Sequence, residues 1–322
     1  MTLITKRSPY IALTYDCNLS CDYCSSEGLY ERNNKNISVK DFVLVIDWLV
    51  KQGVKSIALI GGEPTLHPEF NELMSYAGKK IAIFLPTNGL FEERKKIPFS
   101  KQEIRGATLH LNAKTMYLEN DWKLFNQNAI YLSNLNILTD ISFVIKEVPL
   151  PREEILSFCQ KYKRTLRLAF ARPSAFGKNN FLTFNQIKKI FSSIEKDIMF
   201  FREKGIKTAM FSNLPICIIE NYRPLFSYNS SDLSPNLGTC CSTIDGKFDA
   251  SIVIHPNLTT NICMALPLSN PKRIIEYKSL DEAKKIFAKD FAKIQRKPLF
   301  KKCEICELYN NSCHGGCLVR KL

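Results

Sequence analysis

The sequence lacks the long apolar runs of a membrane protein. No stretch approaches the ~20 consecutive apolar residues of a transmembrane helix, and the first ten residues, MTLITKRSPY, lack the hydrophobic segment of a signal peptide. Both absences predict a cytoplasmic protein without a membrane partner. Internal repeats and low-complexity tracts are also lacking, so a repeat architecture is not expected.

Acidic residues are in deficit, because 31 Asp and Glu face 45 Lys and Arg and leave a formal net charge of +14. The basic residues are scattered, with only short runs such as Lys301-Lys302. A scattered basic surface is mostly solvated, so nucleic acid is not expected as a partner. An acidic peptide or an acidic electron-transfer protein suits this charge better.

The first two-thirds of the chain alternate between short apolar runs and amphipathic stretches. We expect strands near 10–14, 56–60, 81–85, 107–111, 141–145, 166–171 and 207–211, and helices near 38–53, 68–76, 121–132, 152–162 and 184–204. Such alternation predicts an α/β fold of parallel βαβ units. Six units fit a partial (β/α)6 TIM-like barrel, to which we assign residues 1–205.

After about residue 206 the alternation fades and the chain becomes rich in cysteine, with eight of the twelve cysteines in this tail. Thiols in a reducing compartment more often bind metal or react than form disulfides. The apolar segments of the tail are short. We therefore expect residues 206–322 to form a small, loop-rich domain that depends on metal more than on a core.

Three cysteines, Cys17, Cys21 and Cys24, lie within eight positions directly after the first expected strand. One loop can wrap three corners of a cubane, whereas a complete ferredoxin-type site uses four thiolates. The next cysteine along the chain is the distant Cys159. The spacing therefore predicts a [4Fe–4S] cluster whose fourth iron accepts an exogenous ligand, with half of a zinc site as the alternative.

The C-x3-C-x2-C spacing, with the aromatic Tyr23 before its last cysteine, resembles the radical S-adenosylmethionine (radical SAM) superfamily. In that family the methionyl amine and carboxylate of S-adenosylmethionine chelate the open iron. Gly61-Gly62-Glu63-Pro64 resembles the second family motif. The resemblance implies that its glycines allow close backbone approach and that Glu63 helps to hold the methionyl ammonium.

Two further segments carry the same resemblance, which covers about residues 9–211. Thr87-Asn88-Gly89 resembles the end of the family's third strand, so Asn88 joins the expected cofactor-binding residues. Arg172-Pro173 with Gly177 resembles the loop after strand six, and Arg172 could pair with the methionyl carboxylate. Because the carboxyl ends of parallel strands share one edge, the Cys17, Glu63 and Asn88 loops should converge.

The tail resembles the SPASM extension, which carries auxiliary iron–sulfur clusters in radical enzymes that act on peptides and proteins. The resemblance assigns one auxiliary cluster to Cys241, Cys263 and Cys317, and a second to Cys303, Cys306 and Cys313. The last cysteine of the family pattern is missing, because the sequence ends at Leu322. Cys217 and Cys240 could complete two cubanes, one complete cluster with spare thiols is equally consistent, and a zinc tail is the alternative.

The remaining candidates are ordinary residues. Cys159 lies on an expected apolar helix face, which favours a buried, inert thiol. His67, His110 and His255 are isolated and favour ordinary hydrogen-bonded histidines, whereas His314 could donate to a cluster sulfur.

The resemblance implies an enzyme that reductively cleaves S-adenosylmethionine to a 5′-deoxyadenosyl radical, which abstracts hydrogen from a residue of a ribosomally made precursor peptide. The product would be a thioether or carbon–carbon crosslink if an auxiliary cluster takes the electron, or a D-residue if a thiol returns hydrogen. Cys217 and Cys240 are the candidate hydrogen donors, although Cys217 suits a ligand better. A flavodoxin- or ferredoxin-type protein would supply the electron.

Three alternatives remain at this point: maturation of a folded protein in the manner of sulfatase maturases, a small-molecule reaction, and a non-catalytic iron–sulfur electron carrier. The last would need no pocket such as the one that Gly61-Gly62-Glu63-Pro64 indicates. Because the sequence begins close to the first expected strand, no amino-terminal leader-binding domain is expected. Leader recognition would then come from the barrel mouth, the tail or a separate protein.

Overall fold

One mixed sheet organises the computed structural model, which describes residues 8–29, 35–174, 179–212, 214–219, 243–244, 247–248, 251–266, 272–309, 313 and 315–321. The strand order is β11-β10-β1-β2-β3-β4-β5-β6-β7. The bounds are β1 Tyr10–Thr14, β2 Ser56–Gly61, β3 Ala82–Thr87, β4 Ile104–His110, β5 Leu138–Ile145, β6 Thr165–Phe170, β7 Thr208–Met210, β10 Val253–Ile254 and β11 Thr260–Asn261. Strands β1 to β7 pair in parallel with their sequence neighbours.

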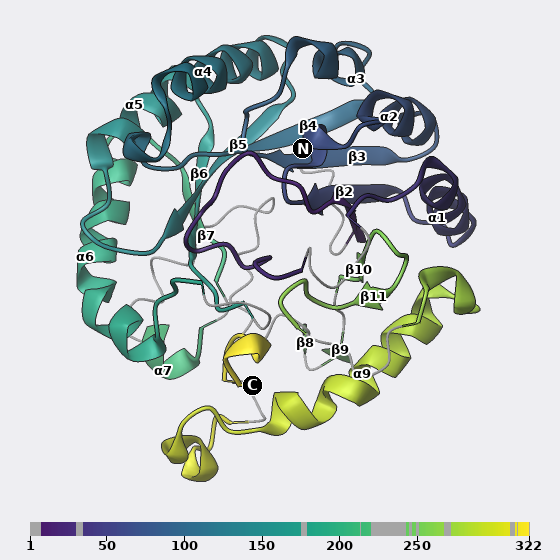
Figure 1. Cartoon of the computed structure of the whole chain (residues 1–322). Helices are drawn as coiled ribbons and strands as arrows, with labels where there is room; N and C mark the ends of the chain where they lie inside the picture. The colour runs from purple at the N-terminus through teal and green to yellow at the C-terminus, as the bar shows by residue number, and fades with distance from the viewer. Residues whose placement is uncertain are drawn as a thin grey trace.

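Helices follow most of the strands. They are α1 Val39–Lys51, α2 Phe70–Gly78, α3 Ile97–Ser100, α4 Glu119–Asn134, α5 Arg152–Tyr162, α6 Phe184–Glu203, α7 Ile216–Ile219 and α9 Leu280–Arg296. In Figure 1 the helices α1 to α6 surround the strands, while β10, β11 and α9 occupy the opposite arc. The expected α/β partial barrel is confirmed, and within the described residues β11 and β7 are unpaired edges of an open sheet.

Helix α1 shows why local sequence signals located most elements. The Ser38 hydroxyl accepts a hydrogen bond from the Asp41 N–H and caps the helix. Phe42, Ile46 and Leu49 share one buried face at helical spacing. Gly53, with φ of +77°, turns the chain towards β2.

The tail packs against the barrel and contains a long helix that the sequence analysis missed. Strand β10 adds to β1 in parallel, with Tyr10 opposite Val253, and the 17-residue helix α9 buries Phe287 and Phe291. Buried residues of the tail and of the barrel form one hydrophobic cluster. The loop-rich prediction is therefore wrong for α9, whose apolar residues recur at the four-residue spacing of an amphipathic helix.

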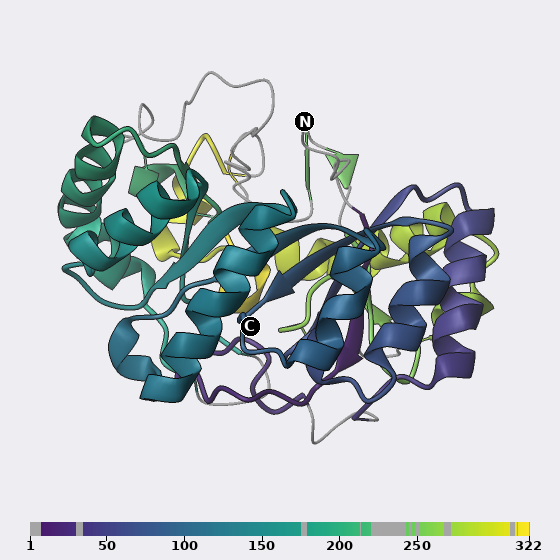
Figure 2. The ribbon, with the colours of Figure 1, turned by 90° about the horizontal axis from the view of Figure 1, so that it is seen from above.

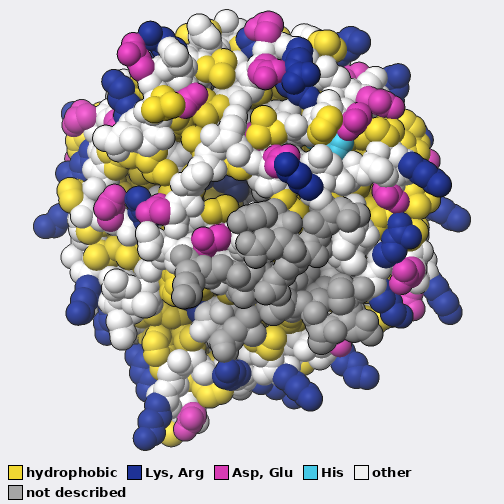
Figure 3. All heavy atoms as spheres, in the orientation of Figure 1, with side chains coloured by type: hydrophobic (Ala, Val, Ile, Leu, Met, Phe, Trp, Pro, Cys, Tyr) yellow, Lys and Arg dark blue, Asp and Glu magenta, His cyan; other side chains and the backbone are white. Residues whose placement is uncertain are grey.

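The surface agrees with the scattered charge of the sequence. Figure 3 shows Lys and Arg side chains distributed around the outline of one face, with Asp and Glu among them.

Figure 2 shows the ribbon from above, with α1 to α6 in front of the sheet and the yellow-green tail behind it. No helix of the described part of the chain combines the length and the apolar character needed to cross a membrane.

Candidate active site

The three-cysteine loop leaves the carboxyl end of β1 through a series of tight turns. The Cys24 N–H donates to the Cys21 carbonyl at 3.1 Å. Cys17 lies at the surface, and Cys21 and Cys24 are half-buried. Partial desolvation, with smaller contributions from the nearby Glu63, Cys21 and Cys24, raises the pKa of Cys17 to about 11, although a hydrogen bond from the Leu19 backbone lowers it. The loop therefore places the Cys17 thiol near enough to Cys21, Cys24 and Glu63 for their charges to affect its pKa.

Gly61 and Gly62 let the loop after β2 lie against the backbone of the cysteine loop. The Gly62 N–H donates to the Thr14 carbonyl at 2.8 Å, and the Glu63 N–H donates to the Asp16 carbonyl at 2.7 Å. A Cβ atom on Gly61 would lie 2.0 Å from the Thr14 oxygen, and one on Gly62 would lie 2.2 Å from the Asp16 oxygen. The close approach expected of these glycines is thus to the chain's own backbone.

Glu63 is a buried carboxylate, 1% exposed, that joins three segments of this edge. Its Oε1 accepts hydrogen bonds from the Thr65 N–H (3.2 Å), the Thr65 hydroxyl (2.7 Å) and the Thr87 hydroxyl (2.9 Å). Its Oε2 accepts one bond, from the Asn88 N–H at 2.7 Å. Burial raises the pKa of Glu63, and these hydrogen bonds lower it. Only Oε2 keeps the capacity for a further donor such as an ammonium group.

Asn88 connects the end of β3 to the cysteine loop. Its side-chain amide donates to the Asn18 Oδ1 at 2.7 Å and lies 3.9 Å from the Cys17 Sγ. Its Oδ1 accepts from the Leu90 N–H, and the Asn18 amide donates to the Leu90 carbonyl. Sequence reasoning missed Asn18, because no local pattern marks a side chain whose partner lies 70 residues away.

Tyr23 points into the barrel and ends in a polar network. Its hydroxyl bonds to the His110 Nε2 at 2.8 Å and to the Asn112 Oδ1, and the His110 Nδ1 bonds to the Ser142 hydroxyl at 3.0 Å. Burial lowers the pKa of His110 to about 4, so the imidazole is neutral at pH 7. The network ties the cysteine loop to the carboxyl end of β4 and to the middle of β5.

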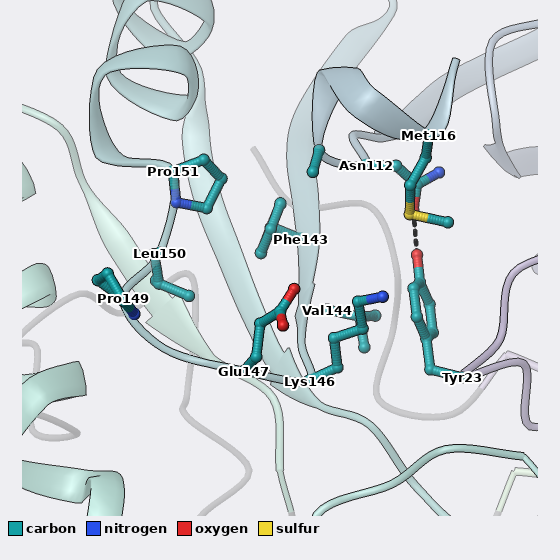
Figure 4. A pocket seen from close by; sticks show the side chains of 11 residues that line it. Tyr23, Asn112, Met116, Phe143, Val144, Lys146, Glu147, Pro149, Leu150 and Pro151 are labelled. Carbon is teal, nitrogen blue, oxygen red and sulfur yellow. Dashed lines mark hydrogen bonds between the residues drawn. The ribbon is translucent and has the colours of Figure 1, made fainter. Parts of the chain in front are cut away.

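A cavity of about 40 Å³ lies beside Tyr23. Figure 4 shows the Tyr23 ring across this cavity from Pro149, Leu150 and Pro151, with its hydroxyl directed at Asn112. The cavity is large enough for water molecules and too small for a nucleoside. Tyr23 therefore forms a wall of the barrel interior, and a direct contact with a cofactor stays a prediction.

The segment after β6 holds the cysteine loop from the other side. Asp22 accepts a hydrogen bond from the Asn180 amide of this segment at 3.1 Å, and it also forms an ion pair at 3.1 Å with Lys146, which follows β5. The Asn179 amide donates to both the Tyr23 and the Arg172 carbonyls. This segment thus fixes the loop between Cys21 and Cys24 and places Arg172 near it.

The described tail cysteines fall into two groups. Burial raises the pKa of Cys263, the nearby Arg172 guanidinium lowers it, and the Cys317 thiol raises it. Burial likewise raises the pKa of Cys217, which Lys302 lowers and the Cys313 and Cys303 thiols raise. Cys263 therefore shares its surroundings with Cys317 and Arg172, whereas Cys217 shares its own with two cysteines of the C-terminal loop.

The remaining residues that the sequence analysis singled out differ in burial and in whether the structure describes them. Cys306 is exposed, Pro64 is buried as the first residue of a short 3-10 helix, and Cys240, Cys241, Gly177 and His314 lie outside the described residues. Cys159 is a 0% exposed thiol of α5, as expected. His67, His110 and His255 are the hydrogen-bonded histidines that the sequence predicted.

His255 ties the tail to the start of the cysteine loop. Its Nδ1 bonds to the hydroxyl of Tyr15, two residues before Cys17, and the histidine is 6% exposed. Burial lowers its pKa to about 4, against ~6.5 in an unfolded chain. The unfolded state therefore binds the proton first, and the stability that neutral His255 contributes is lost as the pH falls from about 6.5 to 4.

We expect the His255→Gln variant to lose less stability on acidification than the wild-type protein. Between pH 7.5 and pH 5 the difference should be about 2 kcal/mol, from the integrated proton linkage. Urea unfolding of both proteins at the two pH values measures it, and comparison with wild type cancels the contribution of His110. Identical pH dependence in the two proteins would contradict the assignment.

The donor set at the carboxyl edge fits an iron–sulfur cluster with an open position. Thiolates are the ligands that iron–sulfur clusters use, and three lie on this one loop, while Cys159 is buried away from it on α5. Within the described residues, no three His, Cys, Asp or Glu side chains converge on a single ion. The Gly62 backbone, Glu63 and Asn88 lie against this loop through hydrogen bonds to Thr14, Asp16 and Asn18.

Comparison with known proteins agrees with this geometry. Residues 11–117 match the Radical SAM superfamily. A probable GTP 3′,8-cyclase of Methanococcus maripaludis is 34% identical over 90 residues, 27% of this chain and 30% of the relative. The mycofactocin maturase MftC of Mycobacterium ulcerans is 26% identical over 176 residues, 51% of this chain and 47% of the relative. The matches therefore span less than half of each of these two relatives.

The fold likeness extends further along the chain than these sequence matches. SuiB of Streptococcus suis, solved with precursor peptide SuiA, superposes with a TM-score of 0.69 at 18% identity, covering 98% of this chain and 73% of SuiB. SuiB has also been solved with S-adenosylmethionine. The three-thiol loop and the loop that carries Glu63 both lie within residues 11–117, the part of this chain that matches the Radical SAM superfamily.

Proposed function

We propose that the protein is a radical SAM enzyme that modifies a peptide. The observation that carries the proposal is the meeting of three loops at one edge of the sheet. Asn88 touches Asn18 and the Cys17 sulfur, and Glu63 hydrogen-bonds to Thr65, Thr87 and Asn88. Such an arrangement supports a cluster whose open position faces a binding pocket, which an electron carrier does not need.

In this proposal Cys17, Cys21 and Cys24 hold the cluster. When bound, the cluster and S-adenosylmethionine supply a 5′-deoxyadenosyl radical that takes hydrogen from a substrate carbon. Glu63 offers its Oε2 to the methionyl ammonium, the only one of its oxygens with spare capacity, and Arg172 offers a cation to the methionyl carboxylate. The barrel wall around Tyr23 and His110 keeps bulk water from the reacting atoms.

A peptide substrate is supported by the relatives. MftC is named a maturase, and SuiB was solved with a precursor peptide. The likeness to SuiB includes the tail, because it covers 98% of this chain, whereas the GTP 3′,8-cyclase match spans 90 residues. The positive net charge suits an acidic electron donor of the flavodoxin or ferredoxin type.

The test is anaerobic reconstitution with iron and sulfide, followed by reaction with a peptide encoded beside the gene. We expect 5′-deoxyadenosine together with a modified peptide in mass spectrometry. An unchanged mass with a D-residue would indicate epimerisation, and a loss of two hydrogens would indicate a crosslink. Formation of 5′-deoxyadenosine with GTP but with no peptide would contradict the proposal and favour a small-molecule enzyme.

We further propose that the tail binds auxiliary [4Fe–4S] clusters. Cys263 and Cys317 belong to one site, together with Cys241 outside the described residues. Cys217 joins Cys303 and Cys313 at the other, because these thiols share surroundings, and Cys306 follows Cys303 at loop spacing. Cys217 then acts as a ligand, while Cys240 remains the candidate hydrogen donor or fourth ligand of the first site.

The Cys217→Ala variant should therefore lose iron from the tail, by up to about four irons per chain if that cubane fails to assemble. The control is Cys159→Ala, which removes a buried thiol of α5 and should leave the iron content unchanged. Iron and sulfide assays with Mössbauer spectra report the result without any turnover. Equal iron content in the two variants would exclude Cys217 as a ligand.

A further inference from the structure

A basic pocket lies at the opposite edge of the sheet from the cysteine loop. Its volume is about 380 Å³, within the range of ligand sites. Two turns form it, one between α5 and β6 and the other between α6 and β7. We call it the basic pocket and define it by its four cations, Lys163, Arg164, Lys204 and Lys207.

The four cations lack acidic partners. The eight residues that line the pocket, all described in the structure, include no Asp or Glu, and none of the salt bridges found among the described residues involves these cations. The Arg164 Nη1 donates to the Lys163 carbonyl at 3.5 Å, whereas the Arg164 Nε is buried without a hydrogen-bond partner. A buried guanidinium N–H without an acceptor costs free energy, which a bound anion would recover.

Helix ends explain only part of this charge. Lys163 and Lys204 are the C-caps of α5 and α6, where the macrodipole places about half a negative charge on each helix end. Two helix ends therefore offset about one of the four positive charges. A net charge of about +3 remains in one pocket, which is more than helix capping requires.

The pocket lies at the amino-terminal ends of β6 and β7. Thr165 lines the pocket, and Arg167, two residues further along β6, points to the same face because side chains alternate. Arg167 forms an ion pair with Asp140 of β5 at 3.6 Å and donates to the Thr108 hydroxyl of β4 at 3.4 Å. The pocket therefore adjoins the face of β6 that carries Arg167.

The type of donor favours carboxylates over phosphate. Phosphate sites use converging backbone N–H groups at a helix N-terminus, whereas the helix ends at this pocket are two C-termini, which offer no such N–H groups. Three of the four cations are lysines on long, flexible stems. Such side chains suit several carboxylates spaced along an extended chain.

We propose that the basic pocket binds an acidic segment of a peptide, rich in Asp and Glu, and so holds a substrate at the amino-terminal ends of β6 and β7. The proposal rests on the proposed peptide-modifying function. It predicts binding that depends on Lys204 and Lys207 and weakens with salt, since exposed charge pairs are screened.

The experiment uses the reconstituted holoenzyme and a hexaglutamate peptide carrying a neutral dye, followed by fluorescence anisotropy at low salt. The test variant is Lys204→Gln/Lys207→Gln. The control is Lys51→Gln/Lys55→Gln, which removes the same charge at the α1–β2 turn, where Lys51 and Lys55 are also exposed. We expect the test variant to bind about tenfold more weakly, because each exposed ion pair contributes a few-fold, and the control to bind like wild type.

Equal losses in the two double variants would overturn the proposal, because binding would then follow net charge alone. Displacement of the peptide by millimolar inorganic phosphate, with no effect of free glutamate, would also overturn it and indicate a phosphate site. Binding is measured without turnover, whereas 5′-deoxyadenosine formation reports the proposed function. The two can therefore fail separately.

Discussion

The Glu63→Ala variant is expected to unfold with a free energy about 3–5 kcal/mol below that of wild type, the range for breaking a buried charged network. The substitution leaves four buried donors without an acceptor, from Thr65, Thr87 and Asn88. Glu63→Gln keeps Oε1 and turns an amide N–H₂ towards the Asn88 N–H. The Glu63→Gln variant should lose less free energy of unfolding, about 2 kcal/mol, because only one pair of donors then faces each other without an acceptor.

Chemical unfolding under anaerobic conditions measures these differences. Glu92→Ala is the matched control, because Glu92 is an exposed carboxylate whose ion pair with Arg94 lies at the surface. Its effect should stay within about 0.5 kcal/mol. If Glu63→Ala and Glu92→Ala proved equally stable, Glu63 would have no role in joining the three loops.

The second large effect is expected from Cys21→Ala. Removing one of three thiolates leaves the loop unable to hold a cubane with one open position. Formation of 5′-deoxyadenosine should fall to the background seen without S-adenosylmethionine, and the iron content should fall with it. Cys159→Ala should retain both, because that thiol is buried on α5.

Zinc analysis of the same variants distinguishes an iron–sulfur cluster at this loop from a zinc site. A zinc site at this loop would appear as zinc in the wild-type protein that is lost in Cys21→Ala, without a visible iron–sulfur absorption band. Full 5′-deoxyadenosine formation by Cys21→Ala would contradict the assignment of this loop to the cluster.

Local signals were sufficient for the elements of the barrel. The N-cap Ser38, the apolar spacing of α1 and the turn glycine Gly53 act within a few residues of one another, so they can be recognised along the chain. The same holds for Cys17, Cys21 and Cys24, whose spacing is itself the signal. Helix α9 was missed because the dense cysteines around it suggested loops, although its amphipathic spacing was present.

The contacts between loops could not be predicted in the same way. The expected convergence of the cysteine, Glu63 and Asn88 loops followed from the rule for parallel strands, but the partners did not. Glu63 bonding to Thr87, Asn88 bonding to Asn18, and Tyr15 bonding to His255 join residues 24 to 240 positions apart. Side chains at such separations have no mutual pattern in the sequence.

The sequence alone determined the α/β barrel, the three-thiol loop and the glycine-rich turn that follows β2, because helix caps, strand periodicity and ligand spacing depend on near neighbours. Only the tertiary structure decided that the Glu63 Oε1 accepts hydrogen bonds from Thr65 and Thr87. It also decided which four cations line one pocket, namely Lys163, Arg164, Lys204 and Lys207. The physical reason is that hydrogen-bond capacity and local charge depend on which turns the folded sheet brings to the same edge.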